Sequence, residues 1–122
     1  MKFGLIGCGR IATNHIKAVM NNHVELVAVC DVRPERMEAL LAKHSLEQDA
    51  SIKRYTDYQE MLKQHEDIKL VAIATESGPH AQIALDCIEK GVHVIIEKPM
   101  AMNLADAQRI IDFAQEKGVK VC

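Results

Sequence analysis

Small residues near the amino terminus are spaced as a phosphate-binding turn requires. They follow an apolar run, Phe3 to Ile6, and precede an amphipathic segment that reaches about Asn21. Gly7 permits a tight turn, Gly9 lets the backbone approach a pyrophosphate, and Ala12 lets a helix pack closely on the strand. We therefore predict a dinucleotide-binding turn between a strand and a helix, with the pyrophosphate at the helix N-terminus. The whole turn reads Gly7-Cys8-Gly9-Arg10-Ile11-Ala12.

An acidic residue follows the second apolar run at the distance from this turn that a ribose-binding carboxylate requires. The run from Val24 to Cys30 ends in Asp31, about twenty residues past the turn. A carboxylate there accepts hydrogen bonds from free ribose hydroxyls but repels a 2′-phosphate, so we expect NAD as the cofactor in preference to NADP. Arg33 is a second candidate contact, and it could reach such a phosphate. The alternative for Asp31 is a solvated strand-end acid or a cap for the next helix.

Two further turns carry reactive side chains after buried strands. Thr75 and His80 follow an apolar run, and Glu97-Lys98-Pro99 follows another. A lysine at this edge of a sheet can hydrogen-bond a reacting hydroxyl and assist its proton transfer. The alternatives are an ordinary exposed lysine, a solvated Glu97 and a histidine that is satisfied in the first turn of a helix. His15 and His93 are expected to have structural roles.

Composition narrows the class of protein. The chain has 122 residues, of which 48% are hydrophobic and 26% charged, and its formal net charge is −2. This balance gives no electrostatic basis for binding nucleic acid or an anionic membrane. The four cysteines are far apart, so neither a metal site nor a disulfide framework is predicted, and we expect Cys8 to be a small residue that the turn tolerates. Free thiols and the absence of a signal-peptide pattern predict a cytoplasmic protein.

Strand and helix patterns alternate along the chain, which predicts an α/β fold with a doubly wound parallel sheet. The fingerprint in the first unit favours a Rossmann fold of about six strands in the order 3-2-1-4-5-6. Ligands bind such sheets outside the carboxyl ends of the strands. Strands are expected at 3–6, 24–30, 53–55, 68–74, 92–96 and from 119, and helices at 10–21, 34–43, 79–90 and 104–117. A further short helix, capped by Thr56 or Asp57, is expected to carry the apolar residues Tyr58, Met61 and Leu62.

The motifs together resemble the nucleotide-binding domain of the glucose-fructose oxidoreductase, inositol dehydrogenase and MocA family. The resemblance covers essentially the whole chain. It rests on the glycine turn, on Cys30-Asp31, on Thr75-x-Ser77-Gly78-x-His80 and above all on the run from Gly91 to Pro99, Gly-Val-His-Val-Ile-Ile-Glu-Lys-Pro.

The resemblance implies an oxidoreductase that uses a nicotinamide cofactor on a sugar, polyol or nucleotide-sugar, with Lys98 beside the substrate. It also implies a homo-oligomer when full-length, and a C-terminal substrate domain that residues 1–122 do not contain. We expect the chain to be the cofactor-binding part of a longer enzyme. Ser77-Gly78-x-His80 and the Arg10-Ile11-Ala12 turn look most similar to the branch that oxidises position 3 of UDP-linked acetamido sugars and their uronates. The alternative is a non-catalytic NAD-binding regulatory module of the same fold.

Overall fold

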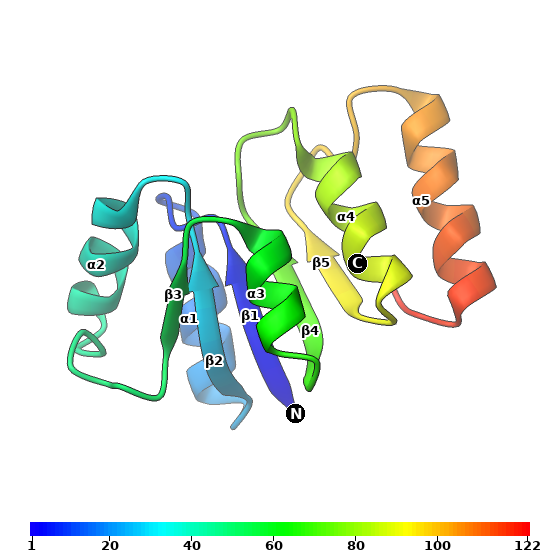
Figure 1. The fold of residues 1–122 in the computed structure, drawn as a ribbon. Helices are drawn as coiled ribbons and strands as arrows, with labels where there is room; N and C mark the ends of the chain where they lie inside the picture. The colour runs from blue at the N-terminus through cyan, green and yellow to red at the C-terminus, as the bar shows by residue number, and fades with distance from the viewer.

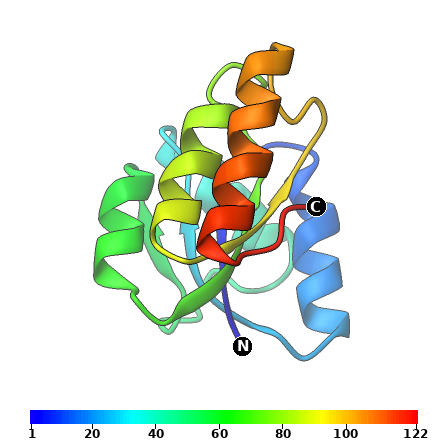
Figure 2. The same ribbon diagram turned by 90° about the vertical axis from the view of Figure 1, so that its right-hand side faces the viewer.

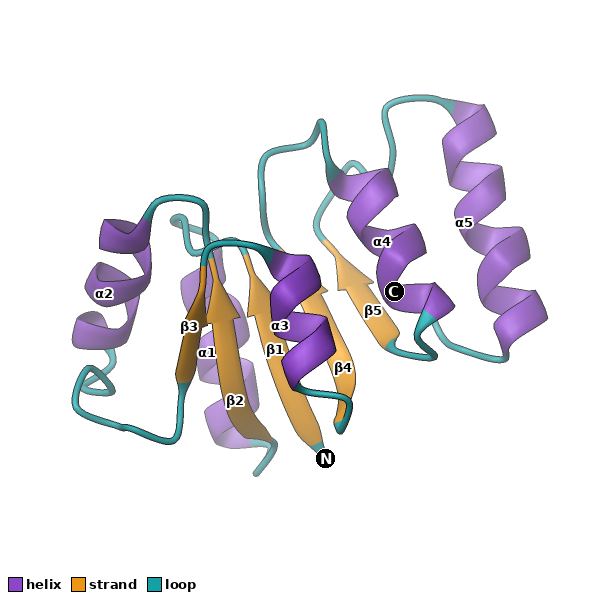
Figure 3. Cartoon of the chain, viewed as in Figure 1, coloured by secondary structure: helices purple, strands orange, loops and turns teal.

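The computed structural model describes residues 1–122 as a parallel sheet with helices on both faces (Figures 1 and 3). Strands and helices alternate without exception along the chain. The strands are β1 (Lys2–Ile6), β2 (Glu25–Cys30), β3 (Lys53–Tyr55), β4 (Ile68–Ile73) and β5 (His93–Ile96). The helices are α1 (Ala12–Asn21), α2 (Pro34–Lys43), α3 (Tyr58–Gln64), α4 (His80–Glu89) and α5 (Leu104–Lys117).

The sheet has five strands in the order β3-β2-β1-β4-β5, which confirms the predicted α/β Rossmann fold. All four strand pairs are parallel. The predicted sixth strand is reduced to a single parallel bridge between Val94 and Val121. Backbone hydrogen bonds join Lys120 and Cys122 to Val94 and Ile96 of β5, and this place beside β5 agrees with the predicted order.

Each face of the sheet packs against a separate hydrophobic core. Helices α1 and α2 cover one face through Ile16, Met37 and Leu41. Helices α3, α4 and α5 contribute to the core of the other face, and Figure 2 shows α4 and α5 side by side. Because apolar groups line both faces, the central strands are almost continuously apolar, as the runs in the sequence predicted.

Local signals account for the helix boundaries. Pro34 lies in the first turn of α2, where a missing N–H costs nothing. Asp57 caps α3 by accepting a hydrogen bond from the amide of Gln59, and Asn103 caps α5 in the same way. Gly118 ends α5 in the left-handed conformation that glycine adopts without strain. The predicted start of α1 was two residues early, and Pro79 is the N-cap of α4 and not its first residue.

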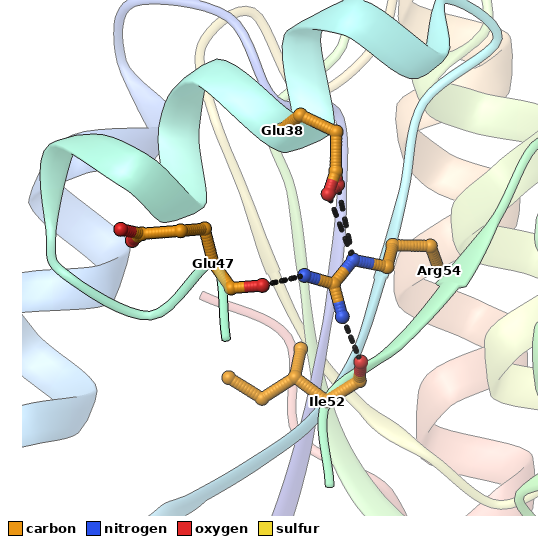
Figure 4. A network of polar contacts seen from close by, with 4 residues as sticks. All are labelled: Glu38, Glu47, Ile52 and Arg54. Atoms are coloured by element: carbon orange, nitrogen blue, oxygen red, sulfur yellow. Dashed lines mark hydrogen bonds and ion pairs between the residues drawn. The ribbon is translucent and has the colours of Figure 1, made fainter. Parts of the chain in front are cut away.

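The short edge strand β3 is tied to α2 by an arginine (Figure 4). The guanidinium of Arg54 donates to both carboxylate oxygens of Glu38 at 3.2 Å. It also donates to the carbonyl oxygens of Ile52 and Glu47, at 2.7 and 2.9 Å. One side chain thereby orders the loop that connects α2 to β3.

None of the helices is long and apolar enough to cross a membrane.

Candidate functional site

The carboxyl ends of the three central strands lie level with one another. Ile6 at the end of β1 pairs with Cys30 of β2 and with Ile73 of β4. The next residues are joined across the sheet, because the Gly7 amide donates to the Cys30 carbonyl at 2.8 Å and the Ala74 amide to the Ile6 carbonyl at 2.7 Å. The glycine turn, Asp31 and the loop that begins at Ala74 are therefore brought to one point of the sheet edge.

A cleft of about 700 Å³ opens at this edge. Its lining comes from the loops that follow β1, β2, β3 and β4, which is where ligands bind in sheets of this kind. Of the residues predicted from sequence to contact a cofactor, those in the lining are Gly7, Gly9, Arg10, Ile11, Asp31, Arg33 and Thr75. Cys8, Ala12 and His80 are buried and are not part of the lining.

Gly7 and Gly9 have different structural reasons to be glycine. Gly7 has a φ of +98°, and a Cβ there would lie 2.5 Å from the backbone carbon of Ala74. Nothing lies within 4 Å of a Cβ added at Gly9. The fold therefore requires glycine at the first position only. Since α1 has no side-chain cap at its N-terminus, the space beside Gly9 is suited to an anionic group at the positive end of the helix dipole.

Gly7→Ala is expected to destabilise the fold by about 4 kcal/mol, because the added methyl group collides with backbone atoms and the residue has positive φ. Chemical denaturation of the two proteins measures the difference. The matched control is Gly9→Ala, for which we expect a change below about 0.5 kcal/mol. Equal stability of the two variants would contradict this assignment.

Asp31 is a structural element of the turn as well as a candidate ribose ligand. It is 7% exposed. Its Oδ2 accepts a hydrogen bond from the Cys8 amide at 2.9 Å, and its Oδ1 accepts one from the Arg33 amide at 2.8 Å. The carboxylate thus fixes the glycine turn against the end of β2. Each oxygen retains a further lone pair for a ligand hydroxyl, because a carboxylate oxygen accepts more than one hydrogen bond.

The two cysteines beside the cleft have no features of reactive thiols. Burial, and to a smaller degree the charge of Asp31, raises the pKa of Cys8 to about 12. The same causes raise the pKa of Cys30 to about 12. The reactive form of cysteine is the thiolate, so both residues are protonated and inert at neutral pH. All four cysteines are free.

The third strand brings residues to the cleft that no motif in the sequence indicated. Thr56, Asp57 and Tyr58 follow β3, and Arg36 lies in the first turn of α2. The Tyr58 hydroxyl donates a hydrogen bond to Asp86 of α4, which fixes the ring at the cleft wall. The order 3-2-1-4-5 was the available signal, since it places the end of β3 beside Asp31. Charged side chains of both signs line the cleft. The cationic ones are Arg10, Arg33 and Arg36, and the acidic ones are Asp31, Asp57 and Glu76.

His80 joins the cleft to the segment that carries Lys98. The ring is buried, with 1% of the residue exposed. Its Nε2 lies 2.8 Å from the carbonyl oxygen of Thr75, and its Nδ1 lies 2.8 Å from that of Pro99. The structure therefore places His80 behind the cleft wall, where both ring nitrogens have protein partners.

Glu97 and Lys98 follow β5 at the same sheet edge, beyond the cleft lining. The amide of Glu97 donates to the carbonyl of Ile73 at 3.1 Å. Its Oε1 lies 2.7 Å from Nε2 of His15, on α1. The Glu97 carboxylate is thus half-buried and paired with His15. The Lys98 side chain is exposed and takes part in none of the ion pairs.

A parallel sheet with a glycine turn after its central strand and a carboxylate after the neighbouring strand defines a dinucleotide-binding Rossmann domain. The particular family follows from the sequence. Residues 1–122 match the GFO/IDH/MocA oxidoreductase family, whose matching region is an NAD-binding Rossmann fold. The chain belongs to this family, which confirms the resemblance found in its motifs.

Relatives with stated activities or ligands are similar over almost the whole chain. Inositol 2-dehydrogenase of Salmonella typhimurium is 33% identical over 123 residues, which covers 99% of this chain and 35% of that protein. Myo-inositol 2-dehydrogenase of Thermotoga maritima is 31% identical over 120 residues, which covers 98% of this chain and 34% of that protein. The WlbA dehydrogenase of Bordetella pertussis, solved with NADH and UDP-GlcNAcA, has 36% identity and a TM-score of 0.85, with coverage of 98% and 34%. The chain thus spans about a third of the length of these proteins.

Proposed function

We propose that residues 1–122 bind NAD and form the cofactor-binding domain of an enzyme that transfers hydride between NAD and a hydroxyl-bearing carbon. The observation that carries the proposal is the cleft itself, in which an open space at Gly9, an uncapped helix end and Asp31 adjoin one another. Relatives of the same family have been solved with NADH or NAD, which supports the choice of cofactor.

Each part of the cleft has a role in this proposal. The backbone at Gly9, Arg10 and Ile11 binds the pyrophosphate, and Asp31 accepts hydrogen bonds from the adenosine ribose. Bound NAD supplies the hydride-accepting ring. Thr75 lines the cleft after β4, and this side of the cleft would hold the nicotinamide half of the cofactor. Lys98 donates a hydrogen bond to the reacting hydroxyl and assists removal of its proton.

The substrate class we propose is a sugar, polyol or nucleotide-sugar. Similarity to inositol dehydrogenases and to a dehydrogenase solved with UDP-GlcNAcA supports this range. Within it we favour a UDP-linked acetamido sugar or its uronate, because the turn motifs of residues 10–12 and 77–80 are most similar to those of that branch. Turnover with UDP-GlcNAcA but not with myo-inositol is the expected result, and the reverse result would select the inositol branch.

The rest of the proposed enzyme follows from the family. We propose that a C-terminal domain supplies the remainder of the substrate pocket and that the full-length protein is a homo-oligomer in the cytoplasm. The competing function is a regulatory module that binds NAD without turnover. An exposed lysine beside the cleft argues for the enzyme, because a sensor needs no group that acts on a hydroxyl. NADH formation by the full-length protein separates the two.

Cofactor choice is a direct test of the proposed role of Asp31. We expect NAD⁺ to bind at least about tenfold more tightly than NADP⁺ in calorimetric titration, since a 2′-phosphate would lie against a carboxylate. Asp31→Asn is expected to weaken NAD⁺ binding and to reduce this ratio by about tenfold. Asp57→Asn is the matched control, because Asp57 lines the same cleft and asparagine caps a helix equally well. Tighter binding of NADP⁺ by the unmodified protein would contradict the assignment.

A further inference from the structure

We infer that His15 and His80 are positioning residues, which hold the residues on either side of Lys98 so that its amine is presented from a fixed backbone. The inference rests on the role proposed for Lys98 above. The two histidines lie on different helices, α1 and α4, and neither of them lines the cleft. Three contacts carry it. Two of them reach the Glu97-Lys98-Pro99 segment, and the third ties the ring of His80 to the Thr75 carbonyl.

His80 fixes the carboxyl side of Lys98. Its ring spans two loops, with one nitrogen at the Pro99 carbonyl and the other at the Thr75 carbonyl, both at 2.8 Å. Both partners are acceptors, and each ring nitrogen lies within hydrogen-bond distance of one of them. Losing the ring would remove the donor that lies between these two half-buried carbonyl groups, and a carbonyl group left without a donor away from water is costly. The ring therefore couples the position of Pro99 to the wall of the cleft.

His15 fixes the amino side of Lys98. It lies one turn into α1, the helix whose N-terminus faces the cleft, and its Nε2 is 2.7 Å from the Glu97 carboxylate. The side chains are 11% and 29% exposed, so solvent competes only weakly for this contact. The Glu97 backbone is also bonded to β4. Glu97 is consequently fixed both to α1, the helix that follows the glycine turn, and to the sheet.

Lys98 lies between these two anchors and is exposed itself. A rigid backbone with a free side chain suits a lysine that binds a ligand. The amine keeps its N–H donors available for the ligand, and the Lys98 backbone is held in a fixed position relative to the cleft. An ordinary surface lysine would need no such support. The histidines act through Lys98, and their loss is expected to affect turnover more than NAD binding.

Amide relaxation measures the proposed rigidity directly. In the ¹⁵N-labelled protein we expect the Lys98 amide to have an order parameter of about 0.85. In His15→Leu and in His80→Leu we expect this order parameter to fall to about 0.6. His15→Gln and His80→Gln keep one donor and should restore much of the order. They also cover the case in which a leucine variant does not fold. His23→Gln is the control, since His23 is exposed in the turn between α1 and β2, at the opposite edge of the sheet.

Kinetics of the full-length enzyme test whether this rigidity matters for the reaction. We expect each leucine variant to lower kcat about tenfold with little change in the Kd of NAD⁺, and to have no further effect in a Lys98→Ala background. An order parameter that does not change, or losses that add to that of Lys98→Ala, would overturn the inference alone. Undiminished turnover in Lys98→Ala would overturn the proposed role of the lysine, and the positioning role with it.

Discussion

Gly9→Val is expected to raise the Kd for NAD⁺ by more than about a hundredfold, a loss of roughly 3 kcal/mol of binding free energy. The valine side chain would occupy the open space beside Gly9, which the proposed binding mode assigns to the pyrophosphate. Because no protein atom lies within 4 Å of the added Cβ, the fold should be unaffected. Calorimetric titration with NAD⁺ measures the loss, and a thermal melt followed by circular dichroism measures the stability.

A graded series strengthens this test. Gly9→Ala adds a single methyl group to the same space and is expected to have an affinity between those of the unmodified protein and the valine variant. The midpoint of thermal unfolding should change by less than about 3 °C in both. A valine variant that binds NAD⁺ normally would show that the turn has a conformational role only.

Lys98→Ala is expected to lower kcat by about a hundredfold or more in the full-length enzyme, with the Kd of NAD⁺ nearly unchanged. The amine is proposed to act on the substrate hydroxyl, so its removal withdraws assistance to proton transfer and leaves the adenosine end of the cleft intact. NADH formation followed by absorbance gives the rate. Calorimetry gives the affinity.

The chain of 122 residues supplies a second comparison. By itself it is expected to bind NAD⁺ but to form no NADH with any sugar, because hydride transfer also requires a group that accepts the proton and a wall that holds the sugar at the cofactor. Lys90→Ala is the matched control for the lysine, since Lys90 is an exposed lysine at the end of α4. Full activity in Lys98→Ala, or turnover by the isolated chain, would refute the corresponding part of the mechanism.

The sequence by itself determined the elements and the centre of the site. Apolar runs and helical periodicity located every strand and helix to within a few residues, because backbone hydrogen bonding and burial of one face are local requirements. The spacing of Gly7, Gly9 and Ala12 identified the turn, because small residues at these three positions recur wherever a strand, a tight turn and a helix bind a dinucleotide. The apolar run that begins at Val119 predicted one more strand, and Val121 pairs in parallel with Val94 of β5.

Tertiary structure alone decided which side chains meet. The Glu97 carboxylate pairs with His15 across 82 residues, and Asp31 bonds to the Cys8 amide across 23. His80 contacts Pro99 across 19 residues. Sequence patterns treated these residues as separate candidates, solvated or locally satisfied. Their partners could not be predicted, because a short-range periodicity specifies the direction of a side chain relative to its own element, whereas the contact depends on how two distant elements pack on the sheet.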